Sequence, residues 1–165
     1  MLDSAILHST QGQPLEGFTI LQKIESPTKL CTIYHQDNVL LVGFGGTRDN
    51  LWDWISNLDP EIEALELLKE IRHWIYIYQP AKVTLAGHSQ GGAHAEIIAR
   101  HIDAEVVTFG GLPAGGVGTH YLVRSDPMAW LPIHRRGMVI KLGKRGFSFL
   151  GHDPKTYLAE LEKLE

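Results

Sequence analysis

Residues 83–99, with the sequence VTLAGHSQGGAHAEIIA, decide the expected fold. The first part is a short apolar run rich in β-branched residues, which predicts a buried strand. The last part has small and apolar residues at helical spacing, which predicts a helix. Between the two lies the pattern Gly87-x-Ser89-x-Gly91. This pattern is typical of a sharp strand–turn–helix that carries a nucleophilic serine.

The glycines of this pattern have a mechanical purpose. A turn this sharp brings the strand and helix backbones close together, so a Cβ atom on either side of Ser89 would not fit. Ser89 is therefore expected at the tip of the turn, near a helix N-terminus whose free N–H groups favour a developing negative charge. The simpler alternative is a glycine-rich loop in which Ser89 is an ordinary helix cap.

Length and composition predict one soluble globular domain over residues 1–165. The chain is 44% hydrophobic and 21% charged, as is usual for this class. Its net charge is −4 and its cations are dispersed, so nucleic acid is not an expected partner. The single cysteine, Cys31, excludes an internal disulfide. The histidines are scattered without the spacing of metal ligands, which predicts no metal site.

The first residues and the hydropathy pattern bear on localisation. Residues 1–4 have no basic segment and no long apolar run follows them, so no signal peptide is predicted. The apolar stretches are too short to span a bilayer. A cytoplasmic protein, or one released without a signal peptide, is expected.

Strand and helix patterns alternate through the middle of the chain, which predicts an α/β sheet with a parallel core. An antiparallel meander is expected before this core, and a hairpin followed by a helix after it. The expected strands cover residues 4–10, 18–24, 30–35, 39–44, the apolar run that begins at Val83, 104–109, 120–124, 137–142 and 147–150, and the expected helices cover 60–78, the segment after Ser89, and 155–164.

A serine alcohol is a weak nucleophile that needs a histidine base, and the base needs a carboxylate to orient it. On a strand–turn–helix of this kind the chain order is serine, acid, histidine. Asp126 ends a strand at the ligand-facing edge of the sheet, so it is the preferred acid. Asp103 precedes its strand and therefore points to the wrong end of the sheet. Asp153 adjoins the best histidine and cannot easily fold back to the ring of that residue. The alternative role for Asp126 is a turn residue before proline.

His152 is the preferred base, because it follows the last expected strand and opens the final helix. His134 also keeps the required order and is the second choice. His120 precedes Asp126 and breaks the order. His88 is held by the turn to face away from the base and is a candidate for the border of the substrate pocket.

An oxyanion formed during acyl transfer needs two hydrogen-bond donors. One is the backbone N–H of the residue after the nucleophile, Gln90. The second is expected from residues 43–48, because glycines after a central strand let the backbone approach a substrate. The same glycines do not fit a dinucleotide or phosphate loop, since the third Rossmann glycine and a following Gly-Lys-Ser/Thr are absent.

Several motifs follow one another in a recognisable order over roughly residues 38–158. They are Phe44-x-Gly46-Thr47, Asp53-Trp54-x-x-Asn57-Leu58, Gly87-His88-Ser89-x-Gly91-Gly92-Ala93, Thr108-Phe109-Gly110-x-x-x-Ala114-Gly115, Ser125-Asp126-Pro127-Met128 with Leu131-Pro132, and His152-Asp153 with Tyr157-Leu158. This series resembles the class 3 (fungal-type) lipase family, and ordered co-occurrence is more specific than any single motif.

The resemblance implies an α/β-hydrolase-type three-layer sandwich, with a mixed sheet, a parallel core and a nucleophile elbow. It also implies that Ser89, Asp126 and His152 form the triad and that Thr47 is the second oxyanion donor. Two features differ from the family. Gly45 stands where the family usually has arginine, and residues 49–55, in the position of the family's lid, form a brief segment.

The sequence therefore predicts a serine carboxylic-ester hydrolase, an esterase or lipase with phospholipase activity in its range, that forms an acyl-enzyme and needs no cofactor. The expected partner is an acyl ester or lipid, with transient contact with a lipid surface. With so little lid, short or medium acyl esters or phospholipids are favoured over emulsified triglyceride. Trp52 and Trp54 form a small apolar flap or pack in the core. The alternatives are an inactive hydrolase-fold binding module and an acyltransferase with the same triad.

Overall fold

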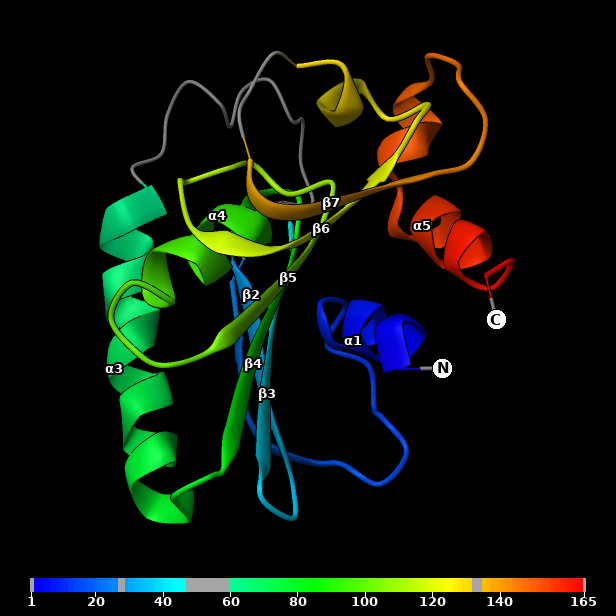
Figure 1. Ribbon diagram of the computed structural model, residues 1–165. Coiled ribbons are helices and arrows are strands. Elements are labelled where there is room, and N and C mark those ends of the chain that lie inside the picture. Colours follow the sequence, from blue (N-terminus) through cyan, green and yellow to red (C-terminus); the bar gives the residue numbers. More distant parts are fainter. Residues whose placement is uncertain (1, 27–28, 47–59, 132–134, 165) are drawn as a thin grey trace.

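A seven-stranded sheet forms the centre of the structure, a computed structural model that describes residues 2–26, 29–46, 60–131 and 135–164. The strands lie in the sheet in chain order, from β1 to β7 (Figure 1). The first three pair antiparallel, and β3 to β7 pair parallel. Their bounds are β1 Thr19–Glu25, β2 Leu30–Gln36, β3 Val39–Phe44, β4 Lys82–His88, β5 Glu105–Phe109, β6 Val117–Val123 and β7 Arg136–Leu142.

Helices cover both faces of the sheet and complete three layers (Figure 1). On one face lie α3 (Pro60–Tyr78) and α4 (Gln90–Ile98), which connect parallel strands. On the other lie α1 (Leu2–Ser9) and α5 (Pro154–Leu161), so the two ends of the described chain are neighbours. Two short 3₁₀ turns, η1 (Pro127–Ala129) and η2 (Phe149–His152), follow β6 and β7. The predicted three-layer α/β architecture with a mixed sheet is confirmed.

Strand β3 shows why a continuous apolar run was needed at the centre. Successive side chains of a strand point to opposite faces. Leu40 and Val42 pack in the core beneath α3 and α4, whereas Leu41 packs in the core beneath α1 and α5. Both faces of β3 are therefore shielded from solvent, as in strands buried on both sides of a parallel sheet.

The carboxyl ends of the parallel strands meet at one edge of the sheet. In register, Phe44 of β3 lies beside Gly87 of β4, and His88 lies beside Phe109 of β5. The residues that follow these ends are Gly45, Ser89 and Gly110. Ligands of open α/β sheets bind at this edge.

The N-terminal prediction was wrong, because residues 4–10 belong to a helix and its final turn rather than to a strand. The Ser9 and Thr10 hydroxyls donate to the carbonyls three residues earlier, Ile6 and Leu7, at 2.6 and 2.7 Å. These bonds satisfy the end of α1 locally. Since short apolar runs fit a strand or a buried helix equally well, periodicity alone could not separate the two.

The prediction of a late hairpin was also wrong. Strand β7 pairs parallel with β6, and residues 149–152 form η2 instead of a second strand. The N–H of Ser148 donates to the Ser125 carbonyl at 2.9 Å, and the Ser148 hydroxyl accepts from Leu150 N at 3.2 Å. The segment is thus held against the turn after β6 and not against β7. The predicted terminal helix is present as α5, although it ends earlier than expected.

The close approach at Gly87 supports a stability prediction. A Cβ at Gly87 would lie 2.2 Å from the Gly91 carbonyl oxygen, a backbone atom that cannot move aside cheaply. We expect Gly87→Ala to lower the free energy of unfolding by about 3 kcal/mol or more. Chemical denaturation measures this. The matched control is Gly146→Ala, where the nearest atom lies 3.7 Å away and the change should stay within about 0.5 kcal/mol. Equal effects of the two substitutions would contradict the tight elbow.

Candidate active site

Ser89 occupies a strained turn between β4 and α4. Its backbone has φ 55° and ψ −122°, a conformation that residues other than glycine rarely adopt. Neighbouring backbone groups hold this turn: Ser89 N donates to Phe109 O at 3.2 Å, and Ser89 O accepts from Leu112 N at 2.9 Å. Such strain persists only where surrounding structure enforces it, and it is frequent at functional sites.

Three side chains from distant parts of the chain meet at this turn. His152 Nε2 lies 2.8 Å from Ser89 Oγ, and His152 Nδ1 lies 3.1 and 3.0 Å from the two carboxylate oxygens of Asp126. A carboxylate only accepts, so Nδ1 carries the proton and Nε2 of the neutral ring accepts from the Ser89 hydroxyl. This is the relative arrangement of nucleophile, base and orienting acid in serine hydrolases.

Asp126 is fully buried, and its carboxylate has further donors besides His152. It caps η1 by accepting from Met128 N at 2.7 Å, and the Tyr157 hydroxyl donates to its Oδ2. Burial, followed by the nearby Asp126 charge, raises the pKa of Tyr157 well above its usual range. Tyr157 therefore keeps its proton and donates to the carboxylate.

Tyr157 and Gly110 are site residues to which sequence reasoning gave no role. Gly110 has φ +56°, and a Cβ there would lie 2.7 Å from both Asp126 Oδ2 and the Tyr157 hydroxyl oxygen. The available signals were a glycine pair after a buried strand and a tyrosine five residues after His152 on the final helix. Neither signal specifies a partner without the tertiary structure.

The prediction that the turn holds His88 facing away from the base was wrong, because its imidazole lies beside that of His152. The His88 Nε2–H donates to the His152 carbonyl oxygen at 2.8 Å, and the two imidazole centroids lie 5.0 Å apart. Burial, followed by the charge of His152, lowers the pKa of His88 from 6.5 to about 4. His88 is neutral near pH 7 and helps to position His152. It also borders a cavity of about 200 Å³ together with Gly45, Gly46 and Pro154.

The oxyanion donors can be placed only in part. Gln90 is the first residue of α4, so no carbonyl within the helix accepts its backbone N–H. A Cβ at Gly46 would lie 2.8 Å from Ser89 Cβ, which shows that the chain leading to Thr47 passes directly beside the nucleophile. Thr47, the predicted flap residues Trp52 and Trp54, and the reserve base His134 lie outside the described residues.

The histidine and aspartate that sequence reasoning set aside have other roles. His120 Nε2–H donates to Arg136 O at 2.9 Å, and its Nδ1 lies 2.8 Å from Thr108 Oγ1. Asp153 caps α5 by accepting from Lys155 N at 2.8 Å. Within the described ranges, no group of three or more His, Cys, Asp or Glu side chains could hold a metal ion. None of the described helices combines the length and apolarity that a membrane span requires.

A second buried carboxylate, Glu96 on α4, holds the loop after β5 in place. Its Oε2 accepts from Ala114 N at 2.7 Å and from Gly116 N at 3.0 Å. This loop begins at Gly110, where a Cβ would lie 2.7 Å from Asp126 Oδ2 and 3.2 Å from His152 Nδ1. Glu96 therefore helps to hold the loop that follows Gly110.

The fold and the elbow together define the α/β-hydrolase class of architecture. No protein family model matches the chain, and a search of curated protein sequences found no match. The comparison with solved structures does give matches, and they agree with this architecture. The chain has the fold of fungal lipases.

Three of these structures illustrate the likeness. A Rhizomucor miehei triacylglyceride lipase is 13% identical, with 87% of this chain and 79% of that chain covered and a TM-score of 0.63. A triacylglycerol lipase from Penicillium expansum is 13% identical over 86% and 78%, with a TM-score of 0.56. A mono- and diacylglycerol lipase from Aspergillus oryzae is 16% identical over 71% and 59%, with a TM-score of 0.53.

The depressed pKa of His88 leads to a pH prediction for stability. Between pH 6.5 and about 4 the unfolded chain binds a proton at this residue that the folded chain does not. Stability from the neutral ring is therefore complete above pH 6.5 and is lost as the pH falls towards 4, by about 1.4 kcal/mol per unit.

Chemical denaturation across this pH range measures the slope. We expect His88→Gln, which keeps an N–H donor, to make the slope shallower, and the exposed control His101→Gln to leave it unchanged. Identical slopes in all three proteins would show that His88 titrates normally in the folded chain.

Proposed function

We propose that this protein is a serine esterase or lipase that hydrolyses carboxylic esters of lipids through an acyl-enzyme on Ser89. The observation that carries the proposal is the His152 imidazole, which bridges Ser89 Oγ at 2.8 Å and the Asp126 carboxylate at 3.0 Å. The fold shared with fungal lipases supports the choice of an ester as substrate. The strained Ser89 backbone further supports a functional role for this residue.

The reaction follows from the proton positions. Ser89 Oγ attacks the ester carbonyl carbon while its proton passes to His152 Nε2, and Asp126 stabilises the imidazolium that forms. His152 then gives this proton to the leaving alcohol oxygen, and the acyl group stays on Ser89. A water molecule next attacks the acyl-enzyme and transfers a proton to His152. The proton returns to Ser89 Oγ as the carboxylic acid leaves.

Two backbone amides are proposed to bind the negative charge that develops on the carbonyl oxygen. The Gln90 N–H lies at the start of α4, where the helix dipole favours an anion. The Thr47 N–H is the second donor, and its proposed role is supported by the contact of the preceding residue, Gly46, with Ser89. Preorganised donors of this kind stabilise the transition state more than the bound substrate.

The proposed substrates are short or medium acyl esters and phospholipids. The segment that would form a lid, residues 49–55, is brief. A chain with little lid has less apolar surface to offer to a long-chain triglyceride at an oil interface.

Active-site labelling tests the proposed nucleophile. We expect a fluorophosphonate probe to label the wild-type protein on Ser89, and Ser89→Ala to lose both labelling and ester hydrolysis by about four orders of magnitude or more. Asp126→Asn should lower the rate by about four orders of magnitude, because the base loses its orienting charge.

The matched control is the exposed Ser26, whose replacement by alanine should leave labelling and turnover unchanged. A wild-type protein without labelling would favour a non-catalytic binding module. Transfer of the acyl group to an added alcohol in preference to water would favour an acyltransferase.

A panel of fluorogenic esters tests the substrate range. We expect short and medium acyl esters and phospholipids to give higher kcat/KM values than emulsified long-chain triglyceride, for the reason of lid size given above. A marked preference for long-chain triglyceride at an interface would contradict the proposed range.

A further inference from the structure

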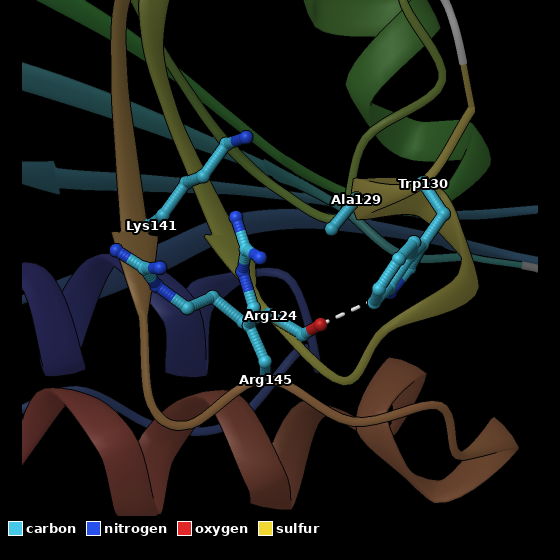
Figure 2. A pocket seen from close by; sticks show the side chains of 5 residues that line it. All are labelled: Arg124, Ala129, Trp130, Lys141 and Arg145. Carbon is cyan, nitrogen blue, oxygen red and sulfur yellow. Dashed lines mark hydrogen bonds between the residues drawn. The ribbon is translucent and has the colours of Figure 1, made fainter.

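A cationic pocket opens beside the turn that carries Asp126. It has a volume of about 290 Å³, and three basic side chains line it. Arg124 directly follows β6, Lys141 lies near the end of β7, and Arg145 belongs to the loop after β7. Figure 2 shows these three side chains grouped together, with Ala129 and the Trp130 indole on the other side of the pocket.

The three cations of this pocket lack carboxylate partners in the described part of the chain. Among the residues that the structure describes, no carboxylate forms an ion pair with Arg124, Lys141 or Arg145. The chain as a whole has a net charge of −4, so a group of unopposed cations is not explained by composition. Like charges at one pocket repel, and an anion between them removes that repulsion. Guanidinium and ammonium groups are the preferred partners of phosphate oxygens.

Large apolar side chains are exposed at the pocket and in the segment that follows Arg145. Trp130 is 56% exposed, and its Nε1–H donates to the Arg124 carbonyl at 3.1 Å, which fixes the indole at the rim. In the segment that continues from Arg145, Phe147 and Phe149, the first residue of η2, are 65% and 63% exposed. Their rings contact each other edge to face, with centroids 5.5 Å apart.

The segments that carry the two apolar groups are bonded together. Ser148, between the two phenylalanines, donates its N–H to the Ser125 carbonyl at 2.9 Å, next to Arg124. Exposed aromatic side chains beside unopposed cations are the composition of surfaces that bind the interface of an anionic bilayer. A soluble phosphate would need the cations but not the aromatics, and a neutral lipid surface would need the aromatics but not three cations.

We propose that Arg124, Lys141 and Arg145 bind the phosphate of an anionic phospholipid in a bilayer, while Trp130, Phe147 and Phe149 enter the interface. This binding stands on the geometry of the pocket. That the docked lipid is also the substrate rests on the ester hydrolysis proposed above. The docked surface would lie against the segments that carry Asp126 and His152, so the bilayer would face the edge of the sheet where Ser89 is placed.

Vesicle co-sedimentation of the full chain with Ser89→Ala tests the binding without hydrolysis. The vesicles consist of phosphatidylcholine alone or of phosphatidylcholine mixed with phosphatidylglycerol. We expect stronger binding to the anionic vesicles by about tenfold or more, and weaker binding as salt is added. Replacing the three cations by glutamine should lower the partition coefficient by about a hundredfold, which is about fivefold for each charge.

The matched control removes three cations elsewhere, with Lys23→Gln, Lys69→Gln and Lys82→Gln, and should change binding by less than about threefold through the altered net charge. Thermal melting checks that each variant is folded. The exposed loop change Arg145→Gln gives a second measurement if the triple variant does not fold, with an expected loss of about fivefold. Phe147→Ser with Phe149→Ser should weaken binding to anionic vesicles and leave its dependence on salt in place.

Each other outcome would overturn the proposal. Equal binding to neutral and anionic vesicles would remove the role of the cations, and so would equal losses in the triple variant and its control. Binding of soluble glycerol phosphate without binding of vesicles would assign the pocket to a small phosphoester. Failure of vesicle binding leaves the fluorophosphonate result unaffected, so the docking surface and the proposed hydrolase activity fail separately.

Discussion

The whole site depends on how closely the backbones approach one another around the elbow. A Cβ at Gly91 would lie 2.2 Å from the Phe44 carbonyl oxygen of β3, and one at Gly92 would lie 2.5 Å from Gly111 Cα. Helix α4 can therefore start directly at the ends of β3, β4 and β5 only because glycine stands at these positions. The same approach brings the loops after β3 and β5 into contact with Ser89, and it forces Ser89 into its positive φ.

A second constraint acts on the histidine and the acid. His152 is held at three points, through its two ring nitrogens and through its own carbonyl oxygen, which accepts from His88. Asp126 is buried without water contact, and a carboxylate in that position is costly unless donors surround it. Met128, Tyr157 and His152 supply these donors. The imidazole is thereby fixed in the tautomer that can accept a proton from Ser89, before any substrate is bound.

The outer rim of the site differs in character from its interior. Ser89, Asp126 and His152 lie among mostly buried polar groups, whereas the turn after β6 and the loop after β7 present cations and exposed aromatic rings. Both kinds of surface arise from the same two segments, because Asp126 and His152 are only a few residues from Arg124 and Phe149. The structure thus joins the proposed chemistry and the proposed lipid contact through short turns instead of a separate domain.

Much of the fold could be predicted from local patterns. Strand β3 and helix α3 have the expected bounds, because long or strongly apolar patterns leave little choice between strand and helix. The strand predictions for residues 4–10 and 147–150 were wrong, because short apolar runs become helix or strand according to what they pack against. The preferred nucleophile, acid and base do meet in the structure. The glycine pattern, chain order and strand ends led to the choice of these candidates, with His134 kept as the second choice for the base.

The sequence by itself determined the elbow and the order of the three candidate residues, because glycine placement and chain order are written in the primary structure. Only the tertiary structure decided which groups surround these residues. Tyr157 donates a hydrogen bond to Asp126, His88 donates one to the His152 carbonyl, and the cations line a pocket beside Trp130. Such contacts join residues that are distant in the chain or that lie on different strands. They are set by the parallel register of β3 to β7 and by the packing of α5, and no local pattern contains that information.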